Sequence, residues 1–336
     1  MITSRQLLKE IGFGVGGLAA VVLLCALIGS EPLSLEGIVK GRQPDAQIFF
    51  QVRLPRLMLA VLVGAALASS GAVFQVLLRN PLAEPYILGI SSGAGLGVML
   101  AVLAGFQWSW GELSAQSLFA FIGALATTAL VWWIGGFTGR TGGPGMILAG
   151  VVVNVFFSAV IMLLTALAKA GQIQTTLFWL MGFLSSYTEM KIWVVSVFLA
   201  GAGFGILLWL SPQLNILSLG TAQARSLGVV PERLFPIAFI AASLLTSAAV
   251  SLSGLIGFVG LIVPHSVRLI FGPDHRRLLP MCALFGAMFL AIADTIARIL
   301  IPQAQLPVGV ITALAGGPFF LLLMIRQSKP VYGGGL

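Results

Sequence analysis

The chain has 336 residues, of which 58% are apolar and only 8% are charged, and its formal net charge is +8. Soluble domains carry about 25% charged residues. A soluble protein of this composition would need an implausible excess of buried core, so the composition excludes that class and indicates a membrane protein.

Ten weakly charged stretches are long enough, or nearly so, to cross the roughly 30 Å hydrocarbon core as α-helices. These predicted spans are residues 11–29, 57–78, 86–106, 113–137, 144–168, 192–210, 234–252, 254–267, 278–297 and 307–325. The stretch 254–267 is short and could be re-entrant, and the apolar piece between Gln172 and Ser186 is predicted to be a half-helix beside a cavity. The fold class is therefore an all-α polytopic membrane protein, with one transmembrane domain over residues 1–336.

The distribution of basic residues orients these spans. An even number of spans puts both termini on one side, and eleven of the 18 lysine and arginine residues then fall on that side. Cytoplasmic loops carry the excess of such residues, so both termini are predicted to be cytoplasmic. The positive net charge is explained by this bias and requires no nucleic-acid partner.

The sequence lacks the patterns of an enzyme. None of its five lysines is followed by Ser or Thr, so there is no phosphate-binding loop for ATP hydrolysis. The run Gly89–Gly93 matches a Gly-x-Ser-x-Gly nucleophile elbow, but its membrane-helix context provides neither the strand nor the histidine that such a site requires. Cys25 and Cys282 stand alone in separate spans, and no ligand spacing predicts a metal site.

A polar hinge between two apolar runs, Arg79-Asn80-Pro81-Leu82-Ala83-Glu84-Pro85, must interrupt any helix that enters it, because it contains two prolines. Further runs accompany it in order: Arg53-Leu54-Pro55-Arg56, Gly89-Ile90-Ser91-Ser92-Gly93-Ala94-Gly95, Leu255 to His265, Asp274-His275-Arg276, Ala293-Asp294 and Leu306-Pro307-Val308-Gly309. With these motifs the chain resembles the permease of type II ABC importers, which take up iron-siderophores, haem and cobalamin.

The resemblance extends over nearly the whole chain and implies an assembly. The permease would be a homodimer in the bacterial inner membrane, in contact with lipid, two ATPase subunits and a periplasmic or lipid-anchored substrate-binding protein. ATP and Mg²⁺ would bind the ATPase, so no cofactor is expected on this chain.

The stretch 213–233 is apolar but too interrupted to span a membrane. We expect it to fold into two short helices separated by glycine breaks. The resemblance implies that it inserts into a groove on the ATPase, whereas an amphipathic connector resting on the membrane surface is the alternative. The predicted coupling residues are Leu217, Leu219, Gly220, Ala224, Leu227 and Gly228.

Three arginines, Arg53, Arg56 and Arg298, lie at span ends on the opposite, outer side. Interfacial snorkelling explains most such residues. The resemblance implies instead that they meet acidic residues of the binding protein. Asp294 lies in a predicted span four residues before Arg298, which predicts a structural ion pair on one helix face.

The resemblance implies that two cytoplasmic loops form the inner gate, with Asn80 and Leu82 in one loop and Thr141 and Gly142 in the other. The alternative is that these loops are simple turns. The prolines and glycines in them suit backbone that lies outside helices yet is protected from lipid.

The fifth predicted span carries Asn154, Ser158, Met162 and Thr165 on one stripe of an apolar helix. Polar groups avoid lipid, so this stripe is expected either to hydrogen-bond a neighbouring helix or to line the transport path. The resemblance favours the path, with Thr312 of the last span beside it.

A rival hypothesis is an ion-coupled secondary transporter. It is suggested by a weak echo between Ala65–Gln75 and Ala241–Gly254, since inverted repeats are common in such carriers. One embedded carboxylate is few for ion coupling, whereas an ABC permease needs none. Among chelates, iron-siderophore is the first expectation, because it is the commonest use of the family, and haem and cobalamin follow closely.

Overall fold

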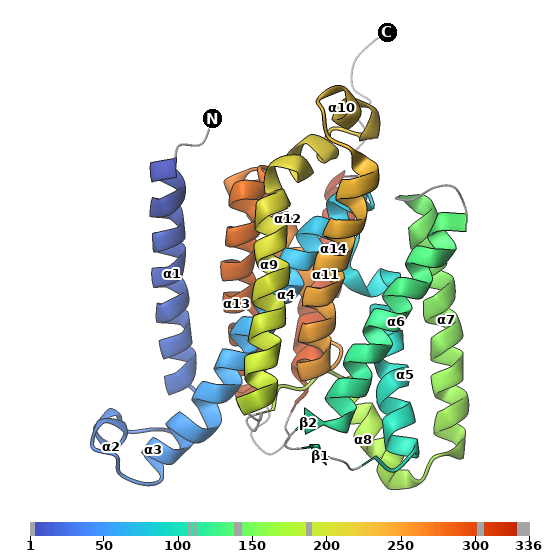
Figure 1. Ribbon diagram of the computed structural model, residues 1–336. Helices are drawn as coiled ribbons and strands as arrows, with labels where there is room; N and C mark the ends of the chain where they lie inside the picture. The colour runs from blue at the N-terminus through green and yellow to red at the C-terminus, as the bar shows by residue number, and fades with distance from the viewer. Residues whose placement is uncertain are drawn as a thin grey trace.

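The computed structural model describes residues 4–106, 109–110, 113–137, 143–185, 190–300 and 306–327. It is a bundle of helices that run roughly side by side (Figure 1). The long helices are α1 (Ser4–Leu27), α4 (Leu54–Leu77), α6 (Ala115–Phe137), α7 (Pro144–Leu167), α9 (Met190–Ser218), α11 (Pro231–Ser253), α13 (His275–Leu300) and α14 (Val308–Gln327).

Shorter elements connect or complete these helices. They are α2 (Leu35–Val39), α3 (Asp45–Gln47), the π-helix η1 (Ile48–Arg53), the 3-10 helix η2 (Pro85–Leu88), α5 (Ile90–Leu103), α8 (Ala170–Leu180), α10 (Thr221–Ser226) and α12 (Val259–Phe271). Among the described residues, the strands are β1 (Ser109–Trp110) and β2 (Leu113–Ser114), which pair antiparallel.

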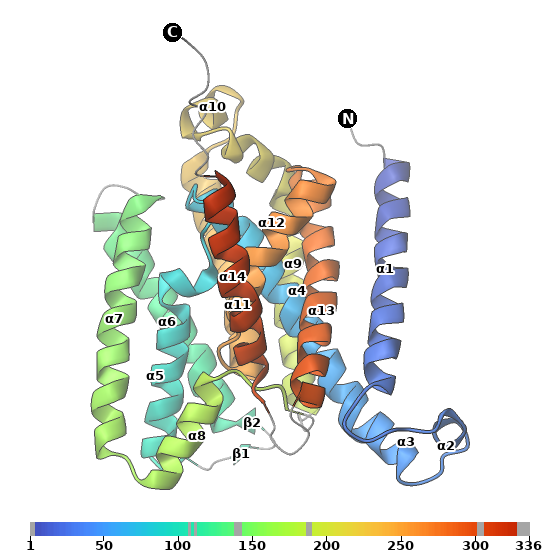
Figure 2. The same cartoon turned by 180° about the vertical axis from the view of Figure 1, so that it is seen from behind.

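The described part of the chain contains ten apolar helices. Seven are long and apolar enough to cross a membrane, and the shorter Ile90–Leu103, Val259–Phe271 and Val308–Leu322 complete the set. Helix α1 begins and α14 ends at the end of the bundle that carries α10 (Figures 1 and 2). The predicted fold class is confirmed, and so is the half-helix, which is α8.

Helix α4 lies at the centre of the bundle and packs against α9, α11, α12 and α13. Of the seven long spans, α4 and α11 are the most buried and α1 and α7 the least. Between α4 and α11, the Thr246 hydroxyl donates a hydrogen bond of 3.0 Å to the Ser70 hydroxyl. Peripheral α1 is tied to α13 by Arg277, whose Nη2 lies 2.6 Å from Oε1 of Glu10.

Two glycines let α4 approach its neighbours closely. A Cβ at Gly71 would clash with the carbonyl oxygen of Gly260 in α12, and a Cβ at Gly64 with that of Gly286 in α13. Close backbone approach of this kind is how membrane helices gain packing contacts. These glycines therefore fix the spacing of the central helices.

We expect Gly71→Val to lower the free energy of unfolding by about 3 kcal/mol, because the clash is with backbone and an overpacked site must repack. Gly16→Val in α1 is the matched control, since a Cβ there meets nothing within 4 Å. Thermal unfolding in detergent measures the difference. Equal melting temperatures for the two variants would contradict this account of the packing.

Helices α5 and α12 are too short to cross alone, with 14 and 13 residues. Each follows irregular backbone: α5 begins after Gly89 with φ of 76°, and α12 after Phe258 with φ of 69°. Such backbone is tolerated at membrane depth only where protein surrounds it or water reaches it. The predicted spans 86–106 and 254–267 are therefore each an irregular entry followed by a shorter helix.

Candidate functional site

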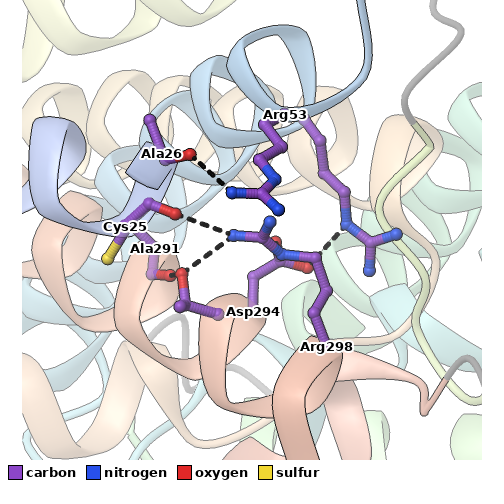
Figure 3. A network of polar contacts seen from close by, with 8 residues as sticks. Cys25, Ala26, Arg53, Ala291, Asp294 and Arg298 are labelled. Carbon is purple, nitrogen blue, oxygen red and sulfur yellow. Dashed lines mark hydrogen bonds and ion pairs between the residues drawn. The ribbon is translucent and has the colours of Figure 1, made fainter. Parts of the chain in front are cut away.

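An ion-pair network joins three helices (Figure 3), where α1 and α13 end and α4 begins, at the end of the bundle opposite α10 (Figure 1). Asp294 of α13 is fully buried, and its carboxylate lies 2.9 Å from Nε of Arg56 and 3.2 Å from Nε of Arg298. Arg53 donates to the carbonyl oxygens of Ala26 and Leu27 at 3.1 and 3.0 Å. The network thus holds together the end of α1, the start of α4 and the end of α13.

The structure places Arg53, Arg56 and Arg298, the residues predicted to face a binding protein, inside this network. Arg53 and Arg56 are buried, and Arg298 is mostly buried, with its Nη2 donating to the Cys25 carbonyl at 3.3 Å. Charges at this depth must be paired, and the chain itself supplies the pairing. Arg56→Glu would set a second carboxylate against Asp294, so it would damage the fold as well as any docking surface.

The predicted ion pair between Asp294 and Arg298 is confirmed. Arg56, the other partner of Asp294, was not foreseen, because it lies 238 residues away in sequence. Its guanidinium also stands over the ring of Phe183, 4.9 Å from the centroid. The sequence signal was a lone carboxylate in a span, which must find a cationic partner when it is buried, but Arg298 four residues later already met that requirement.

At the other end of α4, Asn80 shapes the hinge loop. Its Oδ1 accepts a hydrogen bond of 2.9 Å from the amide of Leu82, and its carbonyl accepts one of 3.0 Å from the amide of Ala83. The preceding Arg79 has φ of 50°, which is rare for a residue with a side chain. Asn80 and Leu82 are half-buried, whereas the predicted gate residues Thr141 and Gly142 lie outside the described residues.

The predicted coupling stretch is built differently from the expectation of two short helices. Helix α9 continues through Pro212 to Ser218, its last turns tilt away from its main axis (Figure 1), and the six-residue α10 follows. The breaks fall at the predicted glycines, since Gly220 has φ of 119° and Gly228 has φ of 82°. Proline bends α9 without ending it, which is the physical reason for the difference.

Burial divides the predicted coupling residues into two groups. Leu217 and Ala224 are buried against the bundle, whereas Leu219 and Leu227 are 61% and 58% exposed. Asn215 fixes the base of this segment, because its Nδ2 donates to Asp274 at 2.6 Å and its Oδ1 accepts from the amide of His275 at 2.7 Å. Of the leucines predicted to couple, Leu219 and Leu227 are therefore the two that expose apolar surface to another protein.

The hinge loop and the coupling stretch border one cavity of about 1160 Å³. Arg79 and Asn80 line it from the hinge, and Leu217, Thr221 and Arg225 line it from the end of α9 and from α10. Helices α6, α7 and α11 complete its walls. The hinge loop and α10 therefore border the same space.

The residues predicted to line the transport path differ in how far they are buried. On α7, Asn154, Ser158 and Thr165 are half-buried and Met162 is 73% exposed. Thr312 is fully buried, and its hydroxyl donates to the Gly309 carbonyl at 3.0 Å. A threonine in a helix can satisfy its hydroxyl on its own backbone, which removes the need for water.

Comparisons with known proteins show which proteins the chain resembles in sequence and in structure. Residues 17–326 match the model of the FecCD transport family. The chain is 39% identical to the hemin transport system permease protein HmuU of Yersinia pestis, over 95% of this chain and 96% of the relative, and 43% identical to the cobalamin import system permease protein BtuC of Halobacterium salinarum, over 81% and 72%. A solved inward-facing conformation of a metal-chelate type ABC transporter superposes with a TM-score of 0.82 at 33% identity, over 95% of this chain and 99% of that one.

Proposed function

Because the chain belongs to the FecCD transport family, the permeases of type II ABC importers for metal chelates, we propose that it forms half of a homodimeric path for an iron-siderophore complex across the bacterial inner membrane. The observation that supports this most is the structural match to a metal-chelate type transporter over nearly the full length of both chains. Relatives named for hemin and cobalamin make those chelates the nearest alternatives.

Two separate ATPase subunits would drive the cycle, and a periplasmic binding protein would deliver the cargo. ATP and Mg²⁺ would be held by the ATPase subunits, which would dock on the end of the bundle that carries α10, with both termini of this chain on the same cytoplasmic side. Their closure would press on residues 213–233 and shift the hinge across the shared cavity. ATP and the loaded binding protein must each bind one conformation of the permease more tightly than the other, since a ligand with equal affinity for both conformations does not shift the equilibrium between them.

The test is reconstitution of the permease with its ATPase and binding protein in proteoliposomes. Uptake of radioactive iron-siderophore, hemin and cyanocobalamin is compared with and without internal ATP. ATP-dependent uptake of the siderophore complex above the other two supports the proposal. Preference for hemin or cobalamin would retain the importer and replace the cargo.

Ion-coupled transport is the second candidate, and the structure of the embedded carboxylate counts against it. Asp294 is held between Arg56 and Arg298, so both sides of the one embedded carboxylate are occupied by a structural ion pair, and a coupling ion would have to displace an arginine. The permease alone in liposomes with an ion gradient is expected to accumulate no solute. Accumulation under those conditions would overturn the ABC importer proposal.

A second copy of the chain is expected to place the two hinge loops near each other. Leu82→Cys, in a background with Cys25 and Cys282 replaced by alanine, should give a disulfide-linked dimer on mild oxidation. Leu8→Cys is the control, because it is 69% exposed on peripheral α1, near the same end of the bundle. Equal cross-linking of both variants, or none at Leu82→Cys with or without ATP, would contradict a gate at the dimer axis.

A further inference from the structure

Three irregular segments meet inside the bundle. They are the hinge up to η2, the turn after α8, and residues 254–258 between α11 and α12. The amide of Phe183 donates to the Ser253 carbonyl at 2.8 Å, and Cβ atoms at Gly182 and Gly254 would clash with the carbonyl oxygens of Leu255 and Trp179. The backbones of the turn after α8 and of the segment that begins at residue 254 are therefore in direct contact, and the hinge reaches the same segment through the side chains of Glu84 and Tyr86.

Two side chains from the hinge side bind the entry to α12. The Glu84 carboxylate accepts a hydrogen bond from the amide of Phe258, and the Tyr86 hydroxyl accepts one of 2.8 Å from the amide of Ile256. We call these two bonds the latch. They connect residues about 170 positions apart in sequence, which is why the hinge motif alone gave no sign of them.

The latch occupies the N-terminal end of α12. Phe258 is the N-cap residue of this helix, and no side chain of its own caps it. The first amides of a helix lack intrahelical partners and carry partial positive charge, so a carboxylate is a favourable acceptor there. Glu84 therefore supplies from the hinge a capping interaction that α12 lacks.

Phe258 carries the connection on to α14. Its φ of 69° is strained for a residue with a side chain, and a Cβ at Gly316 would clash with its ring. The path from gate to last helix is thus the hinge loop, Glu84, Phe258 and Gly316. A cavity of about 490 Å³, lined by Tyr86, Phe258 and residues of α14, borders the same contacts.

We propose that Glu84 is a positioning residue of the transport cycle, whose carboxylate couples the gate loop to α12 and α14 so that the gate moves only together with these helices. This inference rests on the proposed importer function. Glu84 is half-buried, and its partner Phe258 borders the cavity of about 490 Å³, so water in that cavity can take the place of the carboxylate as the acceptor when the loop moves. The bond is therefore one that a conformational change can break and remake.

The decisive variants separate the bond from the bulk of the side chain. Glu84→Gln keeps an oxygen acceptor and is the matched control, Glu84→Ala removes the acceptor, and Tyr86→Phe removes only the second bond. Amide hydrogen exchange of the peptide covering residues 254–260 is measured by mass spectrometry on the purified complex. We expect exchange at least about tenfold faster in Glu84→Ala, because the amide of Phe258 loses its acceptor, and within about threefold of the parent in Glu84→Gln, which keeps an oxygen acceptor.

The second readout is cargo imported per ATP hydrolysed in proteoliposomes. This ratio should fall about tenfold in Glu84→Ala and stay within about threefold in Glu84→Gln, since only the first variant frees the gate from α12 and α14. Unchanged exchange in Glu84→Ala, or faster exchange with an unchanged ratio, would overturn the latch. If Glu84→Ala does not assemble, Tyr86→Phe is judged by the same two criteria, with an expected change of about fivefold to tenfold, and a change within the roughly threefold range of Glu84→Gln would overturn the latch.

The two proposals fail in different ways. If the parent complex shows no ATP-dependent uptake, the importer function itself is refuted. If the parent imports cargo and Glu84→Ala imports it with the same yield per ATP, only the latch is refuted.

Discussion

Asp294→Asn is expected to lower the free energy of unfolding by about 3–5 kcal/mol, the range for breaking a buried ion pair by removing one partner. The amide is nearly isosteric, so packing is preserved, but Arg56 and Arg298 lose the carboxylate that lies 2.9 and 3.2 Å from them. Total stability of a domain is about 5–15 kcal/mol. We therefore expect a sharply reduced yield of folded permease and a large fall in melting temperature in detergent.

Two further variants test whether uncompensated charge is the cause of the stability loss in Asp294→Asn. Glu36→Gln breaks the exposed ion pair with Lys40 and should cost at most about 1 kcal/mol. The triple variant Arg56→Met, Asp294→Leu and Arg298→Met replaces the charged groups by apolar ones of similar size and should recover most of the lost stability. A triple variant no more stable than Asp294→Asn would show that the hydrogen bonds of the network matter more than its charge balance.

The spans could be predicted from sequence because the bilayer sets both length and polarity. The same length criterion showed that the stretch 254–267 is too short for a full span and that the piece near Gln172 is a half-helix. These two segments correspond to α12 and α8. The residues at which helices end were harder to predict from the sequence. Helix α9 runs past Pro212 to Ser218, because a proline near a helix end can bend the helix without stopping it.

The candidate site residues were harder to place, since a span end looks the same whether its arginine faces water or protein. Arg56 was expected to face outward but lies against Asp294, and no local pattern records a partner 238 residues away. Leu217 and Ala224 are buried although they alternate with exposed neighbours. In so short a segment, apolar composition does not tell which face lies against the bundle.

The double variant Leu219→Asp and Leu227→Asp is expected to abolish coupling while leaving the fold intact. Both side chains are exposed, beside the glycine breaks that flank α10, so charge there costs little in folding. In an ATPase groove it would bury unpaired carboxylates, which costs several kcal/mol. Cargo-stimulated ATP hydrolysis should fall at least about tenfold, and the ATPase should no longer co-purify with the permease.

Matched controls separate docking from folding. Val39→Asp makes the same chemical change at an 85% exposed position on α2, toward the opposite end of the bundle (Figure 1), and should leave ATPase co-purification unchanged. Leu217→Asp places the charge at a buried position and should reduce folded protein instead. Gly228→Trp tests the same surface by bulk, because a Cβ there meets nothing within 4 Å; its φ of 82° adds backbone strain, so the yield of folded protein is measured beside it. If the double variant and Gly228→Trp both kept stimulated hydrolysis, the ATPase would have to dock elsewhere, and α10 would be a connector resting on the membrane surface.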